Sequence, residues 1–103
     1  MNKIEIIEKL KNSSNIYDLF NNKEKYITED LIEFEDLELK YLDQKFNYEN
    51  IDFDISDGDR VTTLYFEIEG NHIAIEYRSS SWGDDEYDVF SVIPKQVVVY
   101  EKE

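Results

Sequence analysis

The stretch from Thr62 to Arg78, T-T-L-Y-F-E-I-E-G-N-H-I-A-I-E-Y-R, predicts the sheet around which the rest of the chain is organised. Apolar and polar residues alternate on both sides of Gly70-Asn71. A two-residue loop of this composition favours a tight β-hairpin, because hairpin turns need residues that tolerate a positive φ. The predicted cross-strand pairs are Glu69 with His72, Ile68 with Ile73, Phe66 with Ile75 and Leu64 with Tyr77.

The two faces of this hairpin differ in chemistry. Side chains of a strand alternate between the faces of a sheet, so a buried apolar face implies a second face that is exposed to water. The predicted outer face is acidic, and it carries Tyr65, Glu67, Glu69, His72, Ala74 and Glu76. The sequence therefore predicts a half-exposed antiparallel sheet with carboxylates on its outer surface.

The composition indicates one folded, strongly acidic domain. The chain has 103 residues, of which 25 are acidic and 11 basic, for a formal net charge of -14. Aromatic residues make up 15% of the chain, whereas disordered acidic chains are poor in them. Such a charge argues against direct binding to nucleic acid or anionic membranes and favours a basic protein partner. A charge that serves solubility alone is an equally open alternative.

The sequence also indicates the cellular compartment in which the protein is expected. There is no cysteine, so neither a disulfide framework nor a thiolate zinc site can form. The first residues, M-N-K-I-E-I-I-E-K-L, are interrupted by Glu5 and Glu8 and lack the apolar run of a signal peptide. We therefore expect a cytoplasmic protein.

Helices are predicted before the sheet. Apolar residues recur at helical spacing over residues 3–11, and a second short helix is predicted over residues 15–21, with Ser14 as its cap. Thr28, followed by two acidic residues, predicts a third helix that ends at about Glu35. The helical part of the domain is thus expected at about residues 3–35.

The sheet part is expected at about residues 36–100. Besides the hairpin, alternation predicts strands from about residue 36, over residues 51–56 and over residues 87–93, with a last short β segment at residues 97–100 after Pro94. Asp57-Gly58-Asp59 predicts a turn. The predicted fold is α+β, with N-terminal helices packed on a four- to five-stranded, mainly antiparallel sheet.

The C-terminal half resembles a group of small acidic phage-encoded proteins of poorly defined function. The resemblance rests on Y-F-E-I-E-G-N-H-I-A-I-E-Y, then S-S-S-W-G-D-D-E-Y-D, then V-F-S-V-I-P-K-Q-V-V-V-Y-E, and it covers about the last forty residues. It implies an origin in a mobile element and a role directed at the host. Anti-CRISPR proteins are small acidic phage proteins of this kind, some of which occupy the nucleic-acid site of a nuclease. The resemblance carries no binding residues over to this chain.

Two groups of residues invite a catalytic or metal-binding interpretation. Asp52, Asp54, Asp57 and Asp59 invite a calcium-site interpretation, but they do not match an EF-hand loop, whose position 6 would be Asp57 instead of glycine and whose position 12 would be Thr63 instead of glutamate. His72 is the only histidine, and an ion pair with Glu69 explains it better than general-base catalysis. We expect no enzyme activity, no catalytic or metal site and no cofactor.

The acidic cluster that follows the hairpin is the predicted contact surface. Trp82 offers a rigid apolar ring beside four carboxylates, which suit arginine or lysine side chains of a partner. The predicted partner-binding residues are Glu67, Glu69, Glu76, Trp82, Asp84, Asp85, Glu86 and Asp88. They predict an inhibitor that binds a basic nucleic-acid-binding host protein, such as a CRISPR nuclease, by mimicking nucleic-acid charge. The alternatives are an accessory or structural phage protein and an immunity protein for a basic toxin.

Overall fold

The computed structural model describes residues 2–21, 31–50, 58–79, 85–95 and 102. Two helices, α1 (Lys3–Lys11) and α2 (Ile16–Asn21), precede five strands. The strands are β1 (Leu31–Phe34), β2 (Leu37–Asn50), β3 (Gly58–Ile68), β4 (Asn71–Ser79) and β5 (Asp85–Ser91). None of the helices in these residues is long and apolar enough to cross a membrane.

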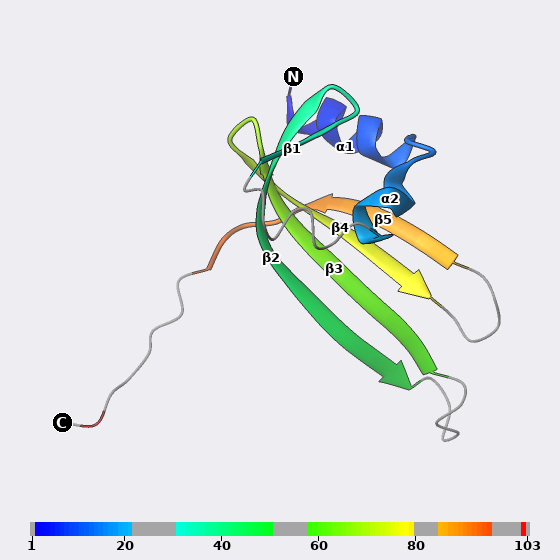
Figure 1. Ribbon diagram of the computed structural model, residues 1–103. Coiled ribbons are helices and arrows are strands. Elements are labelled where there is room, and N and C mark those ends of the chain that lie inside the picture. Colours follow the sequence, from blue (N-terminus) through cyan, green and yellow to red (C-terminus); the bar gives the residue numbers. More distant parts are fainter. Residues whose placement is uncertain (1, 22–30, 51–57, 80–84, 96–101, 103) are drawn as a thin grey trace.

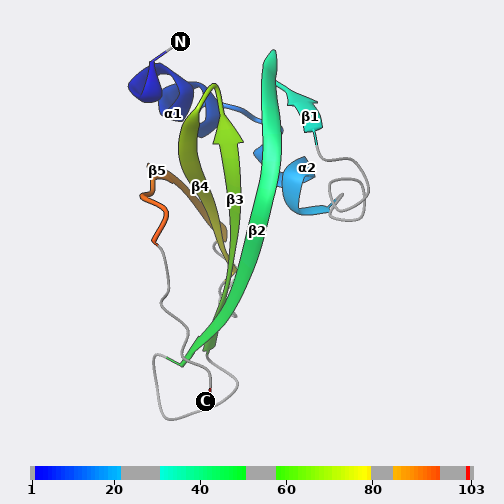
Figure 2. The same cartoon turned by 90° about the vertical axis from the view of Figure 1, so that its left-hand side faces the viewer.

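The strands form one antiparallel sheet in the order β1-β2-β3-β4-β5, so each strand pairs with its neighbour in sequence. Both helices lie on the same side of this sheet, as Figures 1 and 2 show from two directions. The predicted α+β fold, with helices packed on an antiparallel sheet, is confirmed.

The predicted hairpin is present, but its register is shifted. Its two turn residues are Glu69 and Gly70, with φ values of 50° and 80°, instead of Gly70 and Asn71. The side-chain amide Nδ2 of Asn71 donates to the Glu69 carbonyl at 3.3 Å, which supports this turn. The expected pairs are therefore replaced by Ile68 with Asn71, Glu67 with His72, Phe66 with Ile73, Leu64 with Ile75 and Thr62 with Tyr77. The shift moves each partner by two residues, so every side chain keeps its predicted face.

The prediction of a helix ending at about Glu35 is wrong, because residues 31–34 form strand β1. β1 and β2 are joined by a tight turn in which Glu35 and Asp36 have φ values of 51° and 60°. Two residues with positive φ match the twist of the flanking strands and thus close a hairpin. The boundary between the helical and sheet parts of the domain accordingly lies before residue 31.

Smaller differences concern the ends of the strands. Gly58 and Asp59 belong to β3, where they pair with residues 50 and 49, instead of forming a turn. β5 spans Asp85–Ser91, two residues earlier than predicted at each end. The predicted helix start at Thr28 and the strands at residues 51–56 and 97–100 lie outside the described residues.

The core lies between the helices and one face of the sheet. α1 is capped at its start by Asn2, whose side chain accepts the Glu5 backbone amide at 2.8 Å, and Asn12 follows its last residue, where the sequence predicts its end. At the start of α2, the Asn15 amide donates to Ser13 Oγ at 3.2 Å, so the observed contact is made by Ser13 where Ser14 was predicted. The buried cluster comprises Ile6, Leu10, Ile16, Leu19, Phe20, Ile32, Leu37, Leu39, Leu64, Phe66, Ile68, Ile73, Ile75 and Val89.

Aromatic rings hold α2 against β4 and β5. The Tyr77 and Tyr87 rings are 4.9 Å apart between centroids, and the Phe20 ring lies 5.3 Å from Tyr77. Tyr17 contacts both tyrosines edge-on. Burial, followed by the nearby Tyr77 and Asp85, raises the pKa of Tyr87 to about 12. Burial thus favours the protonated hydroxyls of Tyr77 and Tyr87.

Candidate partner-binding surface

Four of the predicted contact residues lie on the face of the sheet that is turned away from the core. Strand register places Glu67 and Glu76 on this face, together with Glu86 and Asp88 of β5. The face is less open than predicted, because Ala74 is fully buried between its half-buried cross-strand neighbours Tyr65 and Phe90. Glu67 and Glu76 are themselves half-buried.

Part of the negative charge on this face is compensated within the chain. Glu76 lies directly opposite Asp88, a like-charge pair that costs stability. However, Arg78 Nη2 lies 3.8 Å from Glu76 Oε1, and Lys11 Nζ lies 3.6 Å from Asp88 Oδ1. Glu86 lies directly opposite Arg78. These carboxylates have cationic neighbours of their own, which reduces their value for a cationic partner.

Of the other four predicted contact residues, the two that the structure describes lie elsewhere. Asp85 lies on the helix-bearing face, where it hydrogen-bonds Tyr77. Burial raises the pKa of Tyr77, the Ser79 hydrogen bond lowers it, and Asp85 raises it again. Glu69 is exposed in the β3–β4 turn. Trp82 and Asp84 lie outside the described residues.

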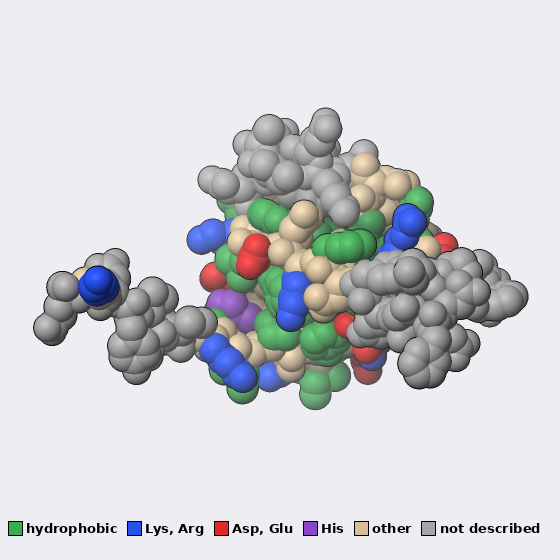
Figure 3. All heavy atoms as spheres, turned by 90° about the horizontal axis from the view of Figure 1, so that it is seen from below, with side chains coloured by type: hydrophobic (Ala, Val, Ile, Leu, Met, Phe, Trp, Pro, Cys, Tyr) green, Lys and Arg blue, Asp and Glu red, His purple; other side chains and the backbone are tan. Residues whose placement is uncertain are grey.

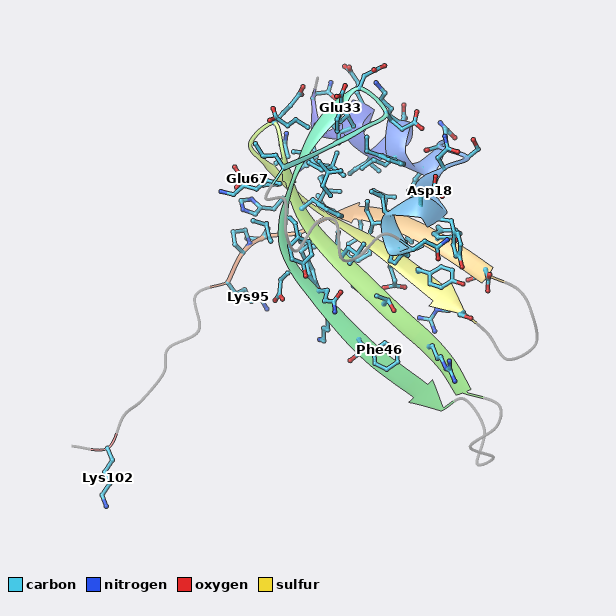
Figure 4. All side chains as sticks on the ribbon, in the orientation of Figure 1. Asp18, Glu33, Phe46, Glu67, Lys95 and Lys102 are labelled. Carbon is cyan, nitrogen blue, oxygen red and sulfur yellow. The ribbon has the colours of Figure 1, made fainter. Side chains whose placement is uncertain are left out.

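A second group of carboxylates gathers at the end of the sheet where the β1–β2 and β3–β4 turns lie. The pairing of Leu39 with Ile68 brings the two turns to the same end, and Figure 4 shows Glu33 at this end. We call this group the turn-end carboxylates, and it consists of the exposed Glu33, Asp36, Glu38 and Glu69. Glu35, in the same turn, is engaged by the Ser13 hydroxyl, which donates to its Oε1 at 2.9 Å.

Glu33 and Glu38 lie directly opposite each other across the β1–β2 hairpin. Among the described residues, no lysine or arginine forms an ion pair with either of them. They line a hollow of about 400 Å³ with Asp36 and three apolar residues, Leu31, Ile32 and Leu37. Leu31 is 52% exposed and shares a strand face with both glutamates. The hollow therefore offers carboxylates beside an apolar wall.

Sequence reasoning missed Glu33, Asp36 and Glu38 as a group, because a helix predicted over residues 28–35 leaves no strand with which the residues from 36 onward can pair. The signal was nevertheless present in L-I-E-F-E-D-L-E-L-K. Its apolar residues at 32 and 34 and at 37 and 39 alternate on both sides of Glu35-Asp36. Aspartate tolerates a positive φ better than most residues, so this pattern is typical of a two-residue hairpin.

The described residues were also compared with the requirements of a metal or catalytic centre. Across residues 2–21, 31–50, 58–79, 85–95 and 102, no group of three histidine, aspartate or glutamate side chains is placed to hold a metal ion. Asp52, Asp54 and Asp57 lie outside these residues. His72 is half-buried opposite Glu67.

Comparison of the chain with protein-family models, with curated proteins and with solved structures gives no match.

Proposed function

We propose that the protein is a non-catalytic inhibitor that binds a basic nucleic-acid-binding protein of the cytoplasm through its carboxylates. A host nuclease, such as a CRISPR effector, is the class of target that the resemblance to small phage proteins implies. The carboxylates would take the place of nucleic-acid phosphates on the basic surface of that target.

The turn-end carboxylates are the observation that carries this proposal. Four exposed acidic side chains lie at the same end of the sheet, two in turns and two in the strands β1 and β2, and Glu33 faces Glu38 without a cation of the described residues between them. Like charges directly opposite each other destabilise a strand pair. A cationic group of a partner that binds between them removes this repulsion, so part of the binding free energy comes from relief within the protein itself.

The hollow beside these glutamates fits an arginine or lysine side chain of the partner. Such a side chain has an apolar stem and a charged end, and it packs its stem on apolar surface while its charge meets a carboxylate. Here Leu31 provides apolar surface next to Glu33 and Glu38. The hollow therefore supports recognition of a basic protein more directly than the half-buried Glu67 and Glu76 do.

The test is competition with double-stranded DNA for purified basic nucleases, measured with a fluorescent duplex. We expect the protein to displace the duplex, and we expect Glu33→Gln/Glu38→Gln to weaken displacement. Glu5→Gln/Glu8→Gln on α1 is the matched control, because it removes the same charge from two other exposed glutamates. Two further variants, Glu67→Gln/Glu76→Gln and Asp85→Ser/Glu86→Ser, test the residues predicted from sequence.

The dependence on salt provides a second criterion. Exposed charges are screened over about 8 Å at physiological ionic strength, so complex formation should weaken steeply as salt rises. Binding that is insensitive to salt, or equal losses in the Glu33/Glu38 and Glu5/Glu8 variants, contradicts the proposal. An immunity protein for a basic toxin would show the same salt dependence, and it would protect against the toxin without displacing DNA. An accessory phage protein would bind none of the nucleases.

A further inference from the structure

A second hollow, separate from the turn-end carboxylates, lies on the face of the sheet away from the core. After β5, residues Val92–Lys95 continue without helix or strand structure, and the Val92 amide donates to the His72 carbonyl at 3.0 Å. Between this segment and β2 is a hollow of about 650 Å³. It is lined by Leu42, Asp43, Gln44, Lys45, Tyr65, His72, Val92, Ile93, Pro94 and Lys95.

The walls of this hollow are largely apolar. A bulge between Tyr41 and Asp43 leaves Leu42 out of the strand register and 40% exposed. A β-bulge re-aims side chains at the edge of a sheet in this manner. Val92, Ile93 and Pro94 form the opposite wall, and the half-buried Tyr65 contributes an aromatic ring. The volume lies within the range of about 300–1,000 Å³ that is usual for small-molecule sites.

The side chains that line this hollow are more basic than the protein as a whole. Its lining residues include Lys45, Lys95 and His72 but a single carboxylate, Asp43. The chain as a whole has 25 acidic and 11 basic residues. Figure 3 shows the histidine on this surface among acidic, basic and apolar side chains, and Figure 4 shows Lys95 beside β2. Two lysines in a setting of net charge -14 mark a local site for an anion.

We propose that this hollow binds a small anion with a flat apolar body, of the class of aromatic carboxylates and sulfonates. The ring of such a ligand packs between Leu42 and Pro94, next to Tyr65, and removes apolar surface from water. Its anionic group lies between the ammonium groups of Lys45 and Lys95. This site shares no lining residue with the hollow at Glu33 and Glu38, so the inference does not depend on the proposed inhibitor function.

The test uses 8-anilinonaphthalene-1-sulfonate as the probe, titrated into the full chain and followed by its fluorescence. We expect saturable binding of one probe per chain. The uncharged analogue N-phenyl-1-naphthylamine should bind more weakly, because it lacks the group that the lysines hold. Lys45→Glu/Lys95→Glu replaces two attractive charges with two repulsive ones, so it should weaken probe binding by about fivefold.

Two further variants test whether the probe binds at this hollow. Lys3→Glu changes the charge of another exposed lysine, on α1, and should leave probe affinity within twofold of the parent protein. Leu42→Asp should abolish binding, because it places a carboxylate in the apolar wall. The proposal is overturned if the probe binds the Lys45/Lys95 variant as it binds the parent, if both analogues bind equally, or if Lys3→Glu weakens binding as much as Lys45→Glu/Lys95→Glu.

Discussion

Glu33 of β1 lies directly opposite Glu38 of β2, so two carboxylates face each other at one of the four paired positions of these strands. A second like-charge pair, Glu76 and Asp88, occurs between β4 and β5. That pair has Arg78 and Lys11 within 4 Å, whereas no described lysine or arginine pairs with Glu33 or Glu38. The sheet thus compensates one repulsive pair internally and leaves the other open to an external cation.

The first prediction concerns this pair. Glu38→Lys should raise the free energy of unfolding by about 0.2–1 kcal/mol, because it places a cation opposite Glu33. The control is Glu86→Lys, which places the same new charge opposite Arg78 and should lower stability. Urea denaturation of both variants measures the two changes. If both variants change the free energy of unfolding in the same direction and by the same amount, the charge of the residue across the strand pair has no influence on stability.

The second prediction concerns the turn at Glu69 and Gly70. Gly70 has a φ of 80° and open space around its Cα, so Gly70→Ala introduces backbone strain without a collision. We expect it to cost about 1–2 kcal/mol in thermal unfolding. Glu69→Asn should instead raise the melting temperature, because asparagine followed by glycine suits a turn with two positive φ values. A Gly70→Ala variant that is as stable as the parent protein in thermal unfolding would contradict the positive φ at this turn.

The third prediction compares two phenylalanines on adjacent strands. Phe66 is fully buried and contacts the Tyr41 ring edge-on, with centroids 6.1 Å apart, whereas Phe46 is 60% exposed. Phe66→Ala should lower the free energy of unfolding by about 3–5 kcal/mol. Phe46→Ala should change it by about 0.5 kcal/mol or less. Chemical denaturation of both variants tests whether β3 forms the centre of the core.

The fourth prediction concerns alkaline pH. The pKa of Tyr87 rises from an ordinary value of 10.0 to about 12 on folding, chiefly through burial. The folded state therefore holds this proton more tightly than the unfolded state. The stabilisation of the folded state by the protonated Tyr87 hydroxyl is fully present below pH 10, and it is lost as pH rises from about 10 to about 12. Melting temperatures measured across this range should fall, and Tyr87→Phe should reduce the slope. An unchanged slope in that variant would exclude Tyr87 as the cause.

Much of the fold could be predicted because its signals are periodic. The spacing of Ile16, Leu19 and Phe20 placed α2, and the alternation around Gly70 placed the central hairpin with the correct faces. The register was wrong because it depends on which two residues adopt a positive φ. Glutamate rarely does so, which made Asn71 the more natural turn residue. Here Glu69 takes that conformation, and the Asn71 amide supports the turn from the next position.

The candidate surface was harder to predict than the fold. Sequence reasoning grouped carboxylates by proximity along the chain, yet Asp85 and Glu86 point to opposite faces of the sheet. Glu33 and Glu38 come together only because β1 folds back onto β2, and the residues of β1 are predicted from the sequence to be the end of a helix. Cationic neighbours such as Lys11 at Asp88 come from another element altogether. A surface depends on register and packing, which local patterns determine incompletely.

The strand order has a consequence for how the chain folds during synthesis. Each strand pairs with the strand that precedes it in the sequence. The sheet can therefore grow strand by strand, and each addition closes only a short loop. The helix α1 precedes the sheet in the sequence, yet it packs against β5, the last of the described strands, and Lys11 reaches Asp88 there. The contacts between α1 and β5 therefore cannot form until β5 has been synthesised. Apolar surface that waits for a distant partner in this way exposes a nascent chain to aggregation.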